Sequence, residues 1–356
     1  MAIQSFKTNI LDPLANHSLA GIRTNEYDGW TGGNTMGIPT AEKLRWFFEH
    51  LLPIVEPTKK PAVEFVRDCF RMGSIMDKQP GSPAHTIAYQ TALRSAVPDC
   101  INQGKYGFCG PAAIAYDFAK RWPKEYARCV LELQGLRVGY IRHDPGPGLE
   151  VQADPGWDVK YVAAGPDKTQ MGPADFLILH AIRRAAERHD LGSFSTVSFQ
   201  ISSPGRTSDA THPFEMKRLL EREGYLNVQN KTFWNPAGSP PEKRPGIDDL
   251  INECAGITRN PVGPVVIVLS HPWLSVNAAG AAAKFEDFNY EPDNRKPPRK
   301  EAKKLAELHW ICVNRLEIQK PDITMDFMSY GAYFENQVYK YEKFKHCLYG
   351  FISADA

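Results

Sequence analysis

The chain has 356 residues, of which 42% are hydrophobic and 23% charged, and this composition excludes a mainly disordered protein. The chain has 42 Lys and Arg residues against 41 Asp and Glu residues, which gives a formal charge of +1. This balance argues against binding to nucleic acid or to an anionic membrane that is driven by the net charge of the chain. The longest apolar run, VVIVL from Val265 to Leu269, is far shorter than the roughly 20 residues that cross a bilayer, so we expect no membrane span.

The N-terminal residues lack the apolar core of a secretory signal, and the seven scattered cysteines include no CxxC pair. Neither a disulfide framework nor a zinc site is indicated, and most of the thiols are expected to be buried in a reducing compartment. We therefore expect a chain that is cytoplasmic as synthesised, which is compatible with delivery by a secretion system that needs no signal peptide. No HExxH pair, Walker loop or dinucleotide fingerprint is present, and we expect no cofactor.

Residues 1–39 are rich in Gly, Asn and Thr and are interpreted as an irregular lead-in. Apolar residues at helical spacing then predict helices over 40–52, 61–72 and 85–96. A largely apolar helix is expected to begin at or next to Cys109, since Pro111 suits a first helical turn. Two further helices are predicted by the same spacing and by a glycine at or near the end of each, over 175–190 and 213–223.

The β-structure is expected mainly in the last hundred residues. Short strand-like pieces broken by turns occur between 136 and 172, and a Pro- and Gly-containing linker covers 230–246. Strands are then predicted over 262–269, 309–318 and 323–327, with one or two more between 337 and 353. Helices first and strands last favour an α+β fold with two lobes over regular βαβ winding.

Cys109 is the residue that the sequence singles out for chemistry. Gly107 and Gly110 flank it, and they allow a tight turn and leave room for a substrate. A thiol reacts as the thiolate, and a helix N-terminus with a nearby histidine is expected to lower its pKa. As a nucleophile it also needs a base within hydrogen-bond reach and donors for the oxyanion.

Each of these roles has a candidate. Gln103 lies six residues before Cys109 and can offer its side-chain amide to an oxyanion, with the Cys109 N–H as second donor. His309 opens the predicted strand HWICV and so projects from a rigid element. Asp326 lies at the end of the next predicted strand, where it can accept from the imidazole and fix its tautomer.

These residues also have purely structural interpretations. A cysteine is more often a buried hydrophobe, a lone histidine at a strand edge is usually structural, and an aspartate at a strand end is often a turn former. Centring the turn on QKPD at 319–322 does not set Asp326 opposite His309, so Asp322 is the alternative acceptor.

The segment QGKYGFCGPAA at 103–113 resembles the nucleophile segment of the papain-like cysteine peptidase superfamily, and HWICV at 309–313 is similar to its histidine strand. Asp326, followed by the pair Tyr330 and Gly331, resembles its Asp or Asn position. The CGPAA form is closer to bacteriocin-processing peptidase domains and to phytochelatin-synthase-like enzymes than to papain.

The resemblance implies a papain-like two-lobe fold over residues 40–356. Its helical left lobe, about 40–256, would start its central helix at the nucleophile, and its antiparallel β right lobe would cover about 257–356. His309 follows Cys109 by 200 residues, which is long for a minimal domain of this kind and implies an insertion, placed at about 277–307.

By this resemblance Cys109 is the nucleophile, His309 the general base and acid, Asp326 the orienting residue and Gln103 the oxyanion donor. It implies a cysteine peptidase-like hydrolase that cleaves an amide bond of a protein or peptide through a thioester, without a metal or cofactor. A protein glutamine deamidase or an acyl or peptidyl transferase on the same triad is the alternative, because all three share one intermediate. A bacterial toxin or effector is the setting that the resemblance suggests.

The run from Arg295 to Lys304 holds six basic residues and two prolines. It is interpreted either as a solvated loop or as a docking arm for an acidic partner. A non-catalytic binding module that holds such a partner is therefore a further hypothesis.

Overall fold

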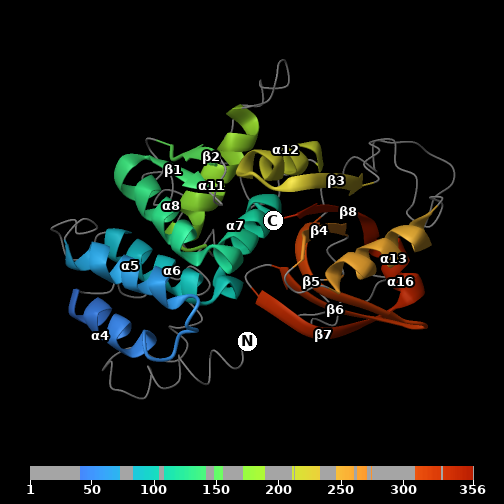
Figure 1. Ribbon diagram of the computed structural model, residues 1–356, viewed down its shortest axis with the longest axis horizontal. Helices are drawn as coiled ribbons and strands as arrows, with labels where there is room; N and C mark the ends of the chain where they lie inside the picture. The colour runs from blue at the N-terminus through green and yellow to red at the C-terminus, as the bar shows by residue number, and fades with distance from the viewer. Residues whose placement is uncertain are drawn as a thin grey trace.

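The computed structural model is drawn in Figure 1. It describes residues 41–72, 83–103, 108–141, 148–154, 171–188, 211, 213–232, 246–259, 263–270, 274, 309–329 and 332–355. The predicted lead-in at 1–39, the predicted insertion at 277–307 and the basic run within that insertion lie outside the described residues.

The helical part of the described chain packs around one central helix, α7, which lies between the other helices and the large sheet in Figure 1. Two short strands form an antiparallel hairpin in this part. In chain order its elements are α4 (Ala41–Leu51), α5 (Lys60–Arg71), α6 (Pro83–Ala96), the 3-10 turn η2 (Pro98–Cys100), α7 (Cys109–Arg121), α8 (Pro123–Leu136), β1 (Val138–Ile141), β2 (Leu149–Gln152), α11 (Pro173–Arg188) and α12 (Pro213–Glu223).

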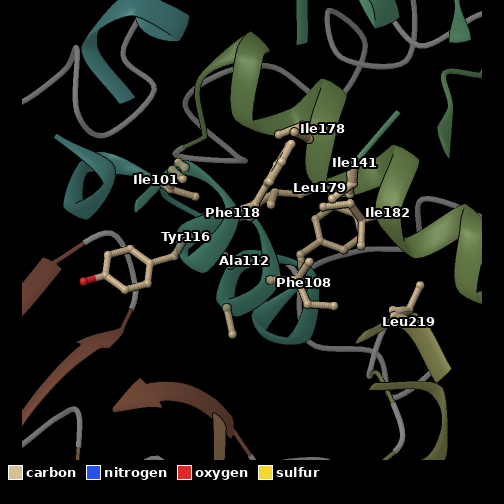
Figure 2. Close-up of a cluster of buried hydrophobic side chains, with 14 of the residues drawn as sticks. Ile101, Phe108, Ala112, Tyr116, Phe118, Ile141, Ile178, Leu179, Ile182 and Leu219 are labelled. Carbon is tan, nitrogen blue, oxygen red and sulfur yellow. The ribbon is translucent and has the colours of Figure 1, made fainter. Parts of the chain in front are cut away.

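Helix α7 is buried on nearly every side because it is built mostly from small and apolar residues. A helix that is apolar all round belongs in the interior of a protein. Figure 2 shows its apolar side chains packed against Ile178, Leu179 and Ile182 of α11, while Tyr116 extends from α7 toward the strands. The residue at its first position is therefore carried by one of the most enclosed helices of the described chain.

The rest of the described chain forms a six-stranded antiparallel sheet in the order β3-β8-β4-β5-β6-β7, accompanied by two helices. In chain order its elements are β3 (Leu226–Thr232), α13 (Ile247–Thr258), β4 (Val265–Ser270), β5 (His309–Gln319), β6 (Asp322–Ser329), β7 (Ala332–Lys340), α16 (Tyr341–Cys347) and β8 (Leu348–Asp355).

Both faces of the sheet centre are buried, as the unbroken apolar run of β4 requires. Alternate residues point to opposite faces. On β5, Trp310 and Cys312 belong to the core that contains α7, whereas Ile311 and Val313 belong to the core that contains α13 and α16. The sheet thus forms a middle layer, with α7 on one face and α13 on the other.

The α+β class with antiparallel strands is confirmed, and most predicted elements are present within a few residues of their predicted bounds. Four elements differ. Helix α8, strand β3 and helix α13 were not predicted, and the tail predicted as strand contains the helix α16 between β7 and β8. The chain therefore enters the sheet at Leu226, about thirty residues earlier than the predicted lobe boundary at 256. None of the described helices has the length and apolar character that a membrane crossing requires.

Candidate functional site

Cys109 is the first residue of α7, and no side chain caps this helix end. The first helical hydrogen bond runs from the Ala112 N–H to the Phe108 carbonyl at 2.8 Å. The amide N–H groups of Cys109 and Gly110 therefore take no part in the helical ladder, and Pro111 has none to offer. The helix presents two backbone donors beside the thiol, which is the arrangement that an anionic group favours.

The Cys109 thiol lies against the N-terminal end of β5. Besides the N–H groups of Cys109 and Gly110, the backbone N–H of Trp310 is within hydrogen-bond reach of its sulfur. That N–H belongs to the peptide unit that joins His309 to Trp310. The fold thus brings the predicted nucleophile to the peptide that follows the predicted base, across 200 residues of sequence.

The expected lowering of the Cys109 pKa is wrong in this structure. Burial raises the pKa of the thiol, and the three backbone N–H groups lower it by less. Only 6% of the residue is exposed. The cause is desolvation, which disfavours the charged thiolate. Cys109 therefore rests as a neutral thiol.

His309 opens β5, as predicted, and is 2% exposed. Its Nε2 lies 2.7 Å from Oγ of Ser329, the last residue of β6, which is also buried. Burial lowers the pKa of His309 to about 3. The imidazole is therefore neutral at neutral pH, and one of its nitrogens can accept a proton.

The carboxylates predicted to orient His309 lie elsewhere. Asp326 is opposite Arg315 on β5, and its two oxygens accept from Arg315 Nε at 2.7 Å and Nη2 at 3.0 Å. Six residues separate Arg315 from His309, roughly 20 Å along an antiparallel strand. Asp322 lies farther still, opposite Gln319, and pairs with Lys340 at 2.6 Å. The turn at 320–321 fixes this register, so the placement of Asp326 beside His309 was wrong.

Gln103 is buried just before the start of α7, and a buried ion pair holds its segment. Asp175 accepts from Arg94 at 3.0 and 2.6 Å and from the backbone N–H of Asn102. Both side chains of this pair are fully buried.

Thr211 packs against the first turn of α7 and against Trp310, and sequence analysis did not find it. Its carbonyl accepts from Trp310 Nε1 at 2.8 Å. Its side chain lies so close to Gly110 that a Cβ on that glycine would be 2.6 Å from Thr211 Cβ. The contact joins segments a hundred residues apart, and no local pattern indicates it.

No group of His, Cys, Asp and Glu that could hold a metal ion occurs among the described residues. Comparison of the chain with protein-family models, with curated proteins and with solved structures finds no match. The case for a function therefore depends on the chemistry of these side chains.

Proposed function

We propose that the protein is a papain-like thiol hydrolase that cleaves amide bonds by acyl transfer through Cys109 and His309. One observation carries the proposal: the Cys109 thiol, at the uncapped start of α7, lies against the peptide unit of His309 and Trp310. A helical lobe that contributes the thiol and an antiparallel sheet that contributes the imidazole also agree with the two-lobe arrangement that the motifs imply.

The proposed reaction starts from a neutral pair. His309 takes the proton of Cys109 as the sulfur attacks the carbonyl carbon, so no free thiolate has to exist beforehand. Negative charge then develops on the carbonyl oxygen, where the Gln103 amide and the Cys109 N–H donate. The Cys109 N–H lies at the start of α7, and burial strengthens its effect on a developing charge.

Three proton transfers complete the cycle. The C–N bond breaks as His309 returns the proton to the leaving nitrogen, which leaves an acyl thioester on Cys109. Water then attacks the thioester while His309 takes a proton from it, and as the C–S bond breaks His309 returns that proton to the sulfur, which releases the carboxylic acid and regenerates the thiol. Asp326 has no part in this mechanism because Arg315 occupies its carboxylate.

The test is to incubate the purified chain with a proteome-derived peptide mixture and to read the products by mass spectrometry. A Cys109→Ala variant in parallel shows which products depend on the thiol. New peptide termini indicate a peptidase, conversion of Gln to Glu a deamidase, and joined peptides a transferase. All three must disappear with Cys109→Ala and fall strongly with His309→Ala.

A mixture left unchanged by the wild-type chain and by Cys109→Ala alike would contradict the proposal. The non-catalytic binding module would then take its place. A Cys312→Ala variant is the matched control, because Cys312 is buried in the same core as Cys109 but lies beside the last turns of α7 rather than its start.

A further inference from the structure

We propose that the groove between α11 and α12 binds an acidic amphipathic helix of a partner protein, with Arg222 as the residue that binds its carboxylates. The proposal does not rest on the reaction proposed for Cys109, because no residue that carries it takes part in that reaction. It rests on the shape of the groove, on the order of apolar and basic side chains along α12, and on a guanidinium N–H that lacks an acceptor among the described residues.

The groove lies where α11 and α12 pack side by side, at the top of the molecule in Figure 1. Its apolar lining comes from Ala185 and Ala186 of α11 and from Leu219 of α12. The hollow holds about 280 Å³, counting the space that is open to solvent. Pockets for small molecules enclose about 300–1,000 Å³, so this shallower site suits side chains that project from the surface of a partner.

Helix α12 presents one stripe of side chains to the groove. Phe214, Arg218 and Arg222 follow one another at intervals of four residues, which places them on one side of the helix. All three line the groove. Phe214 is 47% exposed although it is large and apolar. The stripe therefore has an apolar end and a basic end, about 12 Å apart along the helix axis.

Two carboxylates lie close to the basic end, and neither neutralises it. Glu215 also lines the groove, but it accepts from Arg183 Nη1 at 3.2 Å, in an ion pair that joins α11 to α12. Glu150 of β2 accepts from Gln152 Nε2. Within the part of the chain that the structure describes, Arg222 forms no ion pair.

Arg222 is also an unsatisfied donor. Its Nη1 is buried, and none of the described residues accepts a hydrogen bond from it. A buried N–H without an acceptor is destabilising, and such groups are rare in folded proteins. Burial lowers the pKa of Arg222, the charge of Arg218 lowers it further, and Glu150 raises it by less. A carboxylate from a partner would supply both the missing acceptor and the missing counter-charge.

These features define the chemistry of the partner. Phe214 and Arg218 each have a further interaction, so Arg222 is the residue at which a carboxylate is expected to bind. An apolar side chain of the partner would cover Phe214, about two helical turns away. An amphipathic helix carries groups at this spacing on one face, and helices of this kind commonly bind in grooves. A lone anion would not use Phe214.

The test uses a fluorescein-labelled helical peptide of about 14 residues, with leucines along one face and glutamates beside them. Fluorescence polarisation measures its binding to the full chain. The matched peptide has glutamine in place of every glutamate. We expect the acidic peptide to bind at least about tenfold more tightly, because charge-assisted hydrogen bonds are the strong ones. Its affinity should fall as salt rises from about 0.05 to 0.5 M.

Two substitutions on the stripe should weaken binding. Arg222→Gln removes the charge, and Phe214→Ala removes the apolar contact, so each should raise the dissociation constant by about tenfold. Lys217→Gln is the matched control, because Lys217 is a cation of the same helix that pairs with Glu221 and does not line the groove. It should stay within about twofold of wild type. None of the three side chains is fully buried, so thermal melts of the variants should match that of wild type.

Each of three results would overturn the proposal. An acidic peptide that binds no better than the neutral one, or that Arg222→Gln leaves unaffected, would show that the groove does not recognise charge. Binding that excess inorganic phosphate abolishes and Phe214→Ala does not change would show a site for a lone anion. Self-association of the chain that Phe214→Ala abolishes in sedimentation experiments would place a second copy in the groove. Cys109→Ala should bind the peptide like wild type, so binding is tested separately from the proposed reaction.

Discussion

At the scale of the residue, the resting state of Cys109 sets how the site can react. Burial raises the pKa of the thiol and desolvates it. We therefore expect iodoacetamide to alkylate Cys109 more slowly than the half-buried Cys69 at pH 7, in the absence of a substrate. Peptide mass spectrometry at a series of pH values from about 5 to 10 measures both rates in one sample. Faster labelling of Cys109 already below pH 7 would show a thiolate and contradict the neutral pair.

Gly110 is the second residue whose role can be tested alone. A Cβ there would lie 2.6 Å from Thr211 Cβ and Oγ1 and 2.9 Å from Met216 Sδ. The methionine can move, but the Thr211 backbone is held by its bond from Trp310. Overpacking of this kind costs about 1–3 kcal/mol, so Gly110→Ala should lower the free energy of unfolding by that amount in urea titrations.

Two other helical glycines provide the control for Gly110. A Cβ on Gly135 of α8 or on Gly256 of α13 would meet nothing within 4 Å. Alanine at either position should raise the stability by up to about 1 kcal/mol, because it reduces the freedom of the unfolded chain. A Gly110→Ala variant with a stability equal to or above that of wild type would show that Thr211 and the start of α12 move freely away from α7.

At the scale of the element, the buried pair of Arg94 and Asp175 joins α6 to α11 and fixes the segment before Gln103. Removing one partner leaves a buried charge without its counter-ion. Asp175→Ala should therefore lower the free energy of unfolding by about 3–5 kcal/mol, as measured by chemical denaturation. It should also free the Asn102 N–H and slow acetyl transfer from p-nitrophenyl acetate to Cys109 through a displaced Gln103.

The matched control is Glu221→Ala on α12, where the partner is Lys217 at 3.4 Å and both side chains are about half exposed. Exposed ion pairs one helical turn apart contribute only about 0.3–0.5 kcal/mol, so Glu221→Ala should change the free energy of unfolding by no more than that. A loss below about 1 kcal/mol in Asp175→Ala would mean that water replaces the carboxylate, contrary to the complete burial of the pair.

Elements with a strong local pattern could be predicted from the sequence, and those that depend on packing could not. Helices α5 and α12 show their apolar stripes plainly. Helix α13 has the same spacing at Ile247, Leu250 and Ile251, so its signal was available and was overlooked. Strand β3 has one buried apolar residue at the sheet edge, and α16 has seven residues rich in aromatic side chains. Neither pattern specifies its structure without the tertiary contacts.

The same distinction applies to the site. Cys109 and Gln103 were proposed because the start of a helix has local signals, and His309 because it opens an apolar strand; their roles stay predictions. The prediction that Asp326 lies beside His309 was wrong, because the residue opposite Asp326 depends on the register of a hairpin that contains a bulge between Val313 and Arg315. The raised pKa of the thiol comes from burial by distant segments, which no motif encodes.

At the scale of the whole molecule, one carboxylic acid is buried where the described residues place no cation beside it. Glu223, at the end of α12, is fully buried, and among the described residues its Oε1 has no hydrogen-bond partner. Asp117 of α7 lies near enough to repel it, while Arg121 binds the Asp117 carboxylate at 2.9 Å. Burial, and then Asp117, raise the pKa of Glu223 well above its ordinary 4.5. Glu223 therefore keeps its proton in the folded protein at a pH where the unfolded chain has lost it.

Stability should consequently fall as the pH rises above 4.5, because over that range the folded state binds more protons than the unfolded state. Glu223→Gln has the same shape and no proton to lose. We expect it to be more stable than wild type at pH 7–8, with the difference shrinking toward pH 4. Thermal melts across this range measure it, and Glu221→Gln, half exposed on the same helix, should follow wild type. If Glu223→Gln destabilises the protein more at pH 8 than at pH 4, the pKa of the carboxyl is lowered by folding and the carboxyl is ionised in the folded protein, which contradicts the prediction.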